Sequence, residues 1–180
     1  MNTVIQVTSN PLQVSVTVNK GNYTHELIKD SCVFNVSMLT TETPMKVFEH
    51  FGFQSGRTVN KFADCETEHR AVNHVLYIPK YTNAYLACRV NKSIDFGTHT
   101  MFIADVLDAQ VLSDKPSVTY DYYQKTSNPN HNPRPRSQRM ASAVGSARFA
   151  VISMKEISSP MISNVHCVNT AWRILRRFFR

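Results

Sequence analysis

The architecture of this chain follows from one segment, Leu12-Gln13-Val14-Ser15-Val16-Thr17-Val18-Asn19. Valines at 14, 16 and 18 alternate with polar residues at 13, 15, 17 and 19. This period of two predicts a β-strand with one face in the core and one face toward solvent. Such a strand requires partner strands, which the flanking sequence must supply.

The flanking sequence predicts further strands and two helices. Asn10-Pro11 is a turn signal, and Gly97 separates two long apolar stretches. Strands are predicted over 3–9, 33–39, 84–96 and 98–112, and a segment over 120–125 closes the domain. The first predicted helix runs from Asn22 or Thr24 to Asp30, with Leu27 and Ile28 facing inward. The second helix has Thr43 as its cap and Pro44 in its first turn, and it ends at Gly52.

The order of these elements excludes a regular parallel α/β sheet, because strands and helices do not alternate. We expect a mainly β fold with helices, in which a small antiparallel barrel has helices at its ends. The chain of 180 residues has room for one domain, predicted over 1–125, and a tail over 126–180.

The formal net charge of +7 is distributed unevenly. Residues 1–125 carry 11 Lys and Arg against 12 Asp and Glu, whereas residues 126–180 carry 9 against 1. The predicted domain therefore has no electrostatic sign of nucleic-acid binding. No apolar run is long enough for a membrane span and no signal peptide opens the chain, so we expect a cytoplasmic protein with reduced thiols, Cys32 and Cys88 being buried.

Three polar clusters are candidates for ligand binding. Gln6-Val7-Thr8-Ser9 enters a turn and could hydrogen-bond a planar heterocycle, although an ordinary Ser/Thr turn has the same composition. Asn19, Lys20, Asn22 and Thr24 precede or begin a predicted helix, where amides, a lysine and a hydroxyl suit a phosphate as well as simple capping. Ser55-Gly56-Arg57 offers a cation that could hold a phosphate, or is a solvated loop.

Other chemistry is sparse in the sequence. His99 lies in a predicted strand, where a lone histidine is more often structural than catalytic. We find no Ser-His-Asp order, no paired carboxylates and, before residue 125, no metal-ligand spacing, so no metal site is predicted.

Five segments carry a resemblance to a known family: NTVIQVTSNPLQVSVTVNKGNYTHELI, FNVSMLTTETP, FEHFGFQSGRTVNKF, YTNAYLACRV and DFGTHTMFIADVLDAQVLSDKPSVTYDYY. Over nearly all of residues 2–124 the chain resembles the flavin reductase-like family of FMN-binding split barrels. It is most similar to the branch in which this domain is fused to a C-terminal rubredoxin.

The resemblance implies an FMN-binding split barrel, usually a homodimer, that accepts hydride from NAD(P)H onto the flavin and passes electrons to an acceptor. By position, Gln6, Val7, Thr8 and Ser9 would line the isoalloxazine ring. Asn19, Lys20, Asn22 and Thr24 would lie near the phosphate, Ser55, Gly56 and Arg57 would complete the phosphate or interface loop, and His99 would be the catalytic residue at the reactive face of the flavin.

Two positions depart from the family pattern. Met1 stands where the family has the middle of a strand, so the barrel is expected to be truncated at its N-terminus. Asn73-His74 stands where the family pattern has Asn-Gly, at a turn position where glycine tolerates a positive φ.

The tail resembles neither the barrel nor a rubredoxin in its own reading frame. When the codons are read from one nucleotide earlier, those of Met154 and Lys155 must together encode glutamate, and those of His166 and Cys167 must encode leucine. Four other pairs of neighbouring codons permit cysteine, which would give two C-x-x-C pairs. The permitted sequence resembles a rubredoxin-like iron knuckle. We interpret the tail as a disordered linker and a frameshift-derived segment, the alternative being a basic amphipathic helix.

The sequence leaves three functions open. The first is an enzyme of the NAD(P)H:flavin oxidoreductase type, with a rubredoxin or flavodiiron protein as redox partner. The second is an FMN electron carrier without NAD(P)H activity. The third is a nonfunctional fragment of a flavin reductase–rubredoxin protein.

Overall fold

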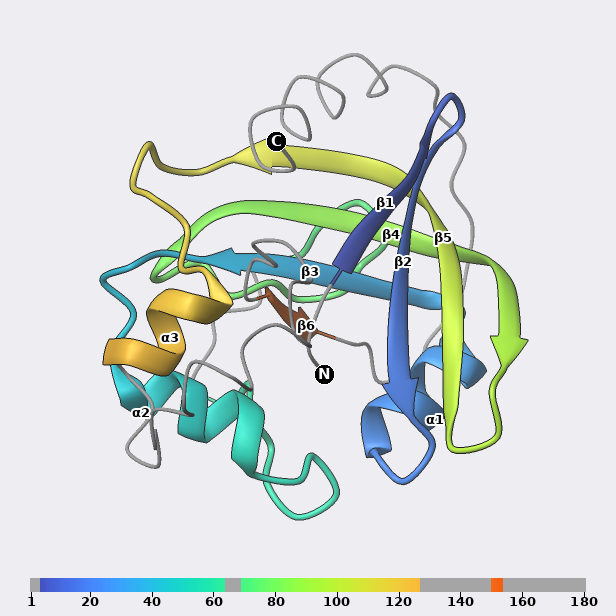
Figure 1. The fold of residues 1–180 in the computed structure, drawn as a ribbon, viewed down its shortest axis with the longest axis horizontal. Coiled ribbons are helices and arrows are strands. Elements are labelled where there is room, and N and C mark those ends of the chain that lie inside the picture. Colours follow the sequence, from blue (N-terminus) through green and yellow to red (C-terminus); the bar gives the residue numbers. More distant parts are fainter. Residues whose placement is uncertain (1–3, 64–68, 127–149, 154–180) are drawn as a thin grey trace, which may run out of the picture.

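A computed structural model describes residues 4–63, 69–126 and 150–153. Its strands form one antiparallel sheet in the order β1-β2-β5-β4-β3-β6 (Figure 1). The elements are β1 (Val4–Ser9), β2 (Leu12–Asn19), α1 (Tyr23–Ser31), β3 (Val33–Leu39), α2 (Met45–Phe48), the π-helix η1 (Glu49–Phe53), β4 (Thr82–Asp95), β5 (His99–Val111), α3 (Tyr120–Thr126) and β6 (Ala150–Ser153).

The predicted alternation of β2 defines the core of the curved sheet. Val14, Val16 and Val18 are fully buried, with exposed fractions of 0, 1 and 0%. Their partners across β5 are Ala104, Phe102 and Thr100, which are also buried. The inner face therefore closes around one apolar cluster to which every strand from β1 to β5 contributes, and this confirms the predicted antiparallel, mainly β fold.

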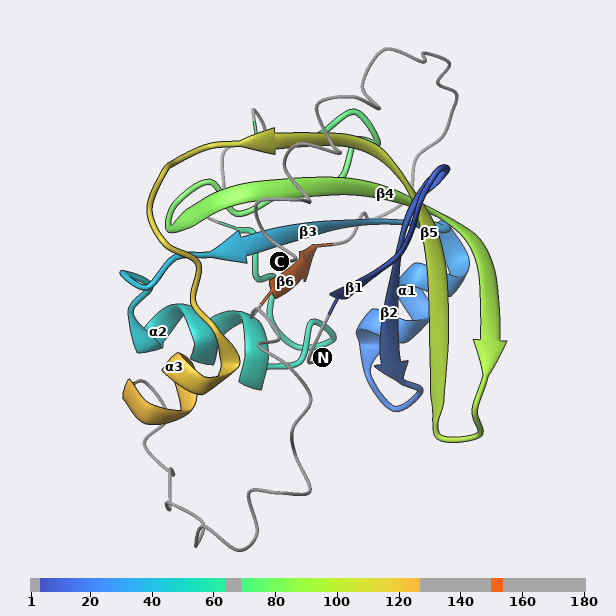
Figure 2. The same cartoon turned by 45° about the horizontal axis from the view of Figure 1, so that its top comes forward.

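The helices lie at opposite ends of the curved sheet, as Figures 1 and 2 both show. At one end α1 packs Ile28 into the main core. At the other end α2 and α3 meet, where the rings of Phe48 and Tyr123 lie 4.9 Å apart in a second apolar cluster with Leu39 and Val118. The prediction that helices cover the ends of the sheet is therefore confirmed.

The segment 69–78 covers the outer face of β3 through buried amides. The Nδ2 group of Asn73 donates to Asn35 Oδ1 at 2.8 Å, and that of Asn35 donates to the carbonyl of Val75 at 2.7 Å. The Ser37 hydroxyl accepts a hydrogen bond from the Ile78 amide at 3.0 Å. Because these bonds satisfy its polar side chains, β3 is buried on both faces from Phe34 to Leu39.

Several local predictions are wrong. Thr43 does not cap the second helix, because its hydroxyl donates to the carbonyl of Thr40 at 2.7 Å and Pro44 is the residue before the first turn. Gly52 does not end that helix but lies inside η1, which continues to Phe53. Cys32 is exposed rather than buried, because it ends α1 in the left-handed conformation with φ 56°. Cys88 is buried, as predicted.

One strand falls within the predicted tail. Residues 150–153 form β6, whose backbone pairs with β3 from Asn35 to Met38. A disordered tail was predicted over 126–180, and these four residues differ from it. The other expectations for the tail, and the truncation expected at the N-terminus, concern residues outside the described part of the chain.

The turn at Asn73-His74 has the positive φ that the family resemblance implies at this position. His74 has φ 61°, while its amide donates to the Ala71 carbonyl at 2.9 Å and its carbonyl accepts from Arg70 at 2.7 Å. The exposed side chain is thus attached to a backbone held in the left-handed region. A β-carbon there crowds the following carbonyl, which costs about 1–2 kcal/mol.

His74→Gly should therefore stabilise the protein, by about 0.5–1 kcal/mol after the added freedom of the unfolded chain is counted. Urea unfolding measures the change. His74→Ala is the matched control, because it removes the imidazole but keeps the β-carbon, and it should give no gain. A gain of equal size in both variants would contradict the assignment of the effect to backbone strain.

Candidate functional site

The ends of β2 and β5 bring two of the predicted clusters and His99 together. Asn19 is paired with His99, and the Lys20 amide donates to the Thr98 carbonyl at 3.0 Å. The chain then turns at Gly21, whose amide donates to Asn19 Oδ1 at 2.8 Å, and enters α1. The start of α1 therefore lies beside the β4–β5 turn.

The first turn of α1 presents unused hydrogen-bond donors. Asn22 precedes the helix in an extended conformation and makes no capping bond with its side chain. In the described part of the chain, the amides of Tyr23 and Thr24 and the Thr24 hydroxyl have no hydrogen-bond partner. These groups and the helix dipole favour an anion at this position.

The loop Ser55-Gly56-Arg57 packs against the same helical turn. The Arg57 guanidinium lies 4.8 Å from the centroid of the Tyr23 ring and forms an ion pair with Glu26. A β-carbon at Gly56 would approach the Tyr23 ring to 3.2 Å, so glycine permits the close contact. The Arg57 amide donates to the Ser55 hydroxyl at 3.2 Å.

Lys61 fixes the segment that carries this loop. Its amino group donates to the Phe51 carbonyl at 2.8 Å, and its own carbonyl contacts His50 Nε2 at 2.9 Å. Burial lowers the pKa of Lys61. The sequence analysis predicts no helix or strand over 53–80, because the bonds that order this segment come from residues outside it.

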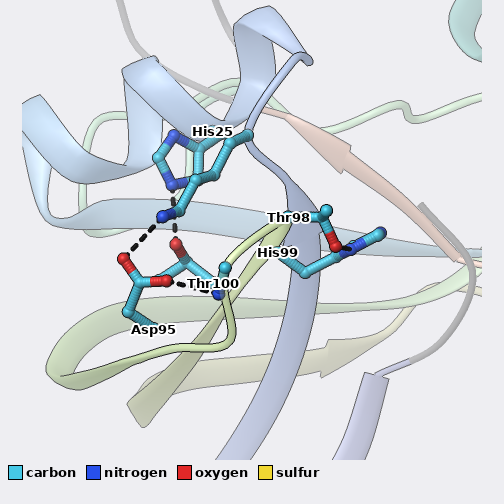
Figure 3. A network of polar contacts seen from close by, with 7 residues as sticks. His25, Asp95, Thr98, His99 and Thr100 are labelled. Carbon is cyan, nitrogen blue, oxygen red and sulfur yellow. Dashed lines mark hydrogen bonds and ion pairs between the residues drawn. The ribbon is translucent and has the colours of Figure 1, made fainter.

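Both cations of the site are paired with carboxylates. Lys20 Nζ lies 2.5 Å from Asp95 Oδ2, and the amide of Gly97 donates to the other oxygen of Asp95 at 2.7 Å (Figure 3). These two hydrogen bonds, the one from Lys20 first, lower the pKa of Asp95. Gly97 has φ 77°, which glycine adopts without strain. Asp95 was not identified from the sequence, although its place before Gly97 is a turn signal.

Two histidines lie on opposite faces of the sheet at this point. His99 is half-buried on the outer face, where its Nδ1 contacts the Thr98 hydroxyl at 2.8 Å. His25, which the sequence analysis missed, is buried on the inner face, with Nε2 2.9 Å from the Thr100 hydroxyl and its ring 5.6 Å from that of Phe102. Figure 3 shows the two rings pointing away from each other.

The first cluster lies at the other end of β2. Thr8 pairs with Gln13 and Gln6 with Val14, and Val7 is the extra residue of a β-bulge between them. Gln13 and Asn19 are six positions apart in β2, a span of about 20 Å. The structure therefore does not bring residues 6–9 together with the other two clusters.

The assembled site can bind an anion and offers one imidazole beside it. Among residues 4–63, 69–126 and 150–153 no group of three His, Cys, Asp or Glu side chains could hold a metal ion. None of the helices described is long and apolar enough to cross a membrane.

Comparisons with known proteins identify a similar domain and several similar proteins. The flavin reductase like domain matches residues 1–129. The chain is 40% identical over 130 residues to the high molecular weight rubredoxin of Moorella thermoacetica, covering 69% of this chain and 54% of that protein. It is 40% identical over 123 residues to the ferric-chelate reductase (NAD(P)H) of Archaeoglobus fulgidus, covering 68% of this chain and 72% of that one. The chain thus spans about half the length of the first relative.

A solved structure supports the fold assignment. The FMN-binding protein from Thermus thermophilus with bound p-hydroxybenzaldehyde superposes with a TM-score of 0.57 at 19% identity, covering 64% of this chain and 67% of that chain. At this identity the likeness concerns the fold alone.

Because His25 and His99 lie on opposite faces of the sheet, their replacement should change the free energy of unfolding by different amounts. His25→Ala should lower the free energy of unfolding by about 2–4 kcal/mol, because it opens a cavity and leaves the Thr100 hydroxyl without a partner. His99→Ala removes a half-buried ring from the outer face and should cost less than about 1 kcal/mol. Urea unfolding measures both, and equal losses would contradict the assignment of His25 alone to the core.

Proposed function

Because this chain belongs to the flavin reductase-like domain family, we propose that it is a flavoprotein that binds FMN, accepts hydride from NAD(P)H onto the flavin and passes electrons to an acceptor. This is an activity of the NAD(P)H:flavin oxidoreductase type. One observation carries the proposal beyond membership of the family. Among the described residues, the amides of Tyr23 and Thr24 and the Thr24 hydroxyl have no partner, and Lys20 and Arg57 belong to segments that adjoin this turn of α1. Such a donor set suits a flavin phosphate.

The residues fit the phosphate of FMN by the chemistry of their donors. The amides of Tyr23 and Thr24 and the Thr24 hydroxyl have no other hydrogen-bond partner within the described residues. Lys20 supplies a cation from the strand side, and Arg57 supplies one from the loop side. Asn19 and Asn22 flank the turn, and Ser55 and Gly56 shape the loop that carries Arg57.

When bound, FMN supplies the redox chemistry, and the protein contributes position and polarity. We propose His99 as the catalytic residue. Its Nδ1 is engaged by Thr98, whereas its Nε2 makes no hydrogen bond in the described part of the chain and remains able to hold or donate a proton. Its half-buried position on the outer face suits contact with a ligand.

We propose that Gln6, Val7, Thr8 and Ser9 line the flavin ring in a homodimer. Their separation of about 20 Å from Asn19 favours a site completed by a second copy of the chain. Ile5 and Val7 support this arrangement, since they are 54% and 49% exposed on β1, an edge strand of the described sheet.

We further propose a cytoplasmic location and a redox partner of the rubredoxin or flavodiiron type. Cys32 and Cys88 are free thiols, as is usual in a reducing compartment. The Moorella relative is named a rubredoxin and extends well beyond the match. The same relative favours a second candidate, an FMN electron carrier that lacks NAD(P)H activity.

FMN affinity provides the first test. Lys20→Ala combined with Thr24→Ala should weaken FMN binding by about 1–3 kcal/mol, since charge-assisted hydrogen bonds are lost. Riboflavin, which lacks the phosphate, should bind both proteins equally. Quenching of flavin fluorescence measures both affinities. Lys29→Ala, in the last turn of α1, is the matched control and should change neither. An unchanged FMN affinity in the double variant would place the phosphate elsewhere.

Flavin reduction provides the second test and separates the enzyme from the carrier. Mixing the FMN-loaded protein with NADH or NADPH should bleach the flavin absorbance. In His99→Ala the bleaching rate should fall at least about tenfold, because a positioned proton donor is lost, with FMN affinity unchanged. The absence of bleaching in the unmodified protein would favour the carrier. Bleaching at the same rate in both proteins would remove His99 from the proposed site.

A further inference from the structure

The inference concerns Asp95 and rests on the proposed FMN site. Lys20, the cation nearest the start of α1 in sequence, is already held by this carboxylate at 2.5 Å. The side chains of Lys20 and Asp95 are 38% and 64% exposed, so water and ligands can reach the pair. A phosphate that approaches Lys20 therefore meets a negative charge in contact with the same ammonium group.

The position of Asp95 is set by backbone contacts rather than by Lys20 alone. One of its carboxylate oxygens accepts from the Gly97 amide at 2.7 Å, and the Phe96 amide donates to the His99 carbonyl at 2.8 Å within the same turn. Lys20 is anchored independently, through its amide to Thr98. Figure 3 shows both oxygens of the Asp95 carboxylate engaged. The carboxylate thus stays beside the site whether or not Lys20 turns toward a ligand.

The second ion pair of the site differs from the first. Glu26 pairs with Arg57, but Arg57 also stacks on the Tyr23 ring, so its position does not depend on the carboxylate alone. Lys20 has no aromatic contact and no second side-chain partner in the described part of the chain. Competition between the carboxylate and a ligand is therefore strongest at Lys20.

From this geometry we propose that Asp95 competes with the flavin phosphate for Lys20 and thereby limits the preference of the site for FMN over riboflavin. The carboxylate weakens binding of FMN and does not affect riboflavin. A bound phosphate must share Lys20 with the Asp95 carboxylate or displace the carboxylate from Lys20. This competition weakens the hold on FMN, so the flavin can exchange. Asp95 acts through Lys20 and is a residue that sets affinity rather than a catalytic one.

Asp95→Asn tests the competition directly. Asparagine keeps an oxygen for the Gly97 amide, so the turn is retained, while the negative charge beside Lys20 is lost. FMN should bind about two- to fivefold more tightly, a range typical for one exposed charge pair, and riboflavin affinity should be unchanged. The control is Asp121→Asn, which breaks the exposed Asp121–Lys125 pair on α3 at the other end of the sheet and should leave FMN binding unchanged. Unchanged or weaker FMN binding in Asp95→Asn would overturn the proposal.

Two further measurements make the outcome decisive. In a Lys20→Ala background, Asp95→Asn should lose most of its effect on FMN, whereas an undiminished gain would mean general repulsion and would overturn competition for Lys20. Inorganic phosphate, followed through the amide resonances of Tyr23 and Thr24, tests the site without flavin. Tighter phosphate binding by Asp95→Asn, with no flavin binding by either protein, would support the role of Asp95 and refute the proposed flavoprotein function. Binding of neither FMN nor phosphate would refute both.

Discussion

The antiparallel register between β2 and β5 is the constraint on which the rest of the structure depends. It runs from Gln13 paired with Asp105 to Asn19 paired with His99. Side chains alternate between faces, so a shift of one residue would turn Val14, Val16 and Val18 from the core to solvent. The hydrophobic gain from burying these valines therefore also fixes which polar residues meet beyond the strand ends. Lys20 reaches Asp95, and His25 reaches Thr100, because Asn19 lies opposite His99.

Electrostatic balance is the second property of this end of the sheet. The two cations beside α1 are matched by Asp95 and Glu26, and the segment 1–125 is close to neutral as a whole. Recognition of an anion here should come from directed donors at short range, because the described residues create no broad positive field around the site. Such a site selects its ligand by the geometry of amides and hydroxyls more than by total charge.

The sequence predicts the parts of the fold that depend on local periodicity and on turn residues. The strand 12–19, the helix that follows it and the long hairpin at Gly97 are all present. The left-handed turn at His74 is also present, but it was expected from the family resemblance and not from the residues themselves. The parts that were missed depend on contacts between distant segments. The π-helix at Glu49–Phe53 is held by Lys61, and the inward position of His25 is set by Thr100 on another strand. In the candidate site, the packing of Arg57 on Tyr23 and the pairing of Lys20 with Asp95 have no periodic signal in either segment. The pairing of residues 150–153 with β3 is likewise a matter of distant backbone contact.

The exposed thiol of Cys32 is a site at which the protein can be labelled selectively. Cys32 ends α1, and the anion-binding turn begins the same helix, which at nine residues is about 13 Å long. Cys88 is buried and burial raises the pKa of its thiol, so it reacts slowly while the protein is folded. With Cys65 and Cys167 replaced by serine, a fluorophore attached at Cys32 would lie within energy-transfer range of a flavin at the far end of the helix. The protein would then report occupancy of its own site as a change in donor lifetime, without any need to follow turnover.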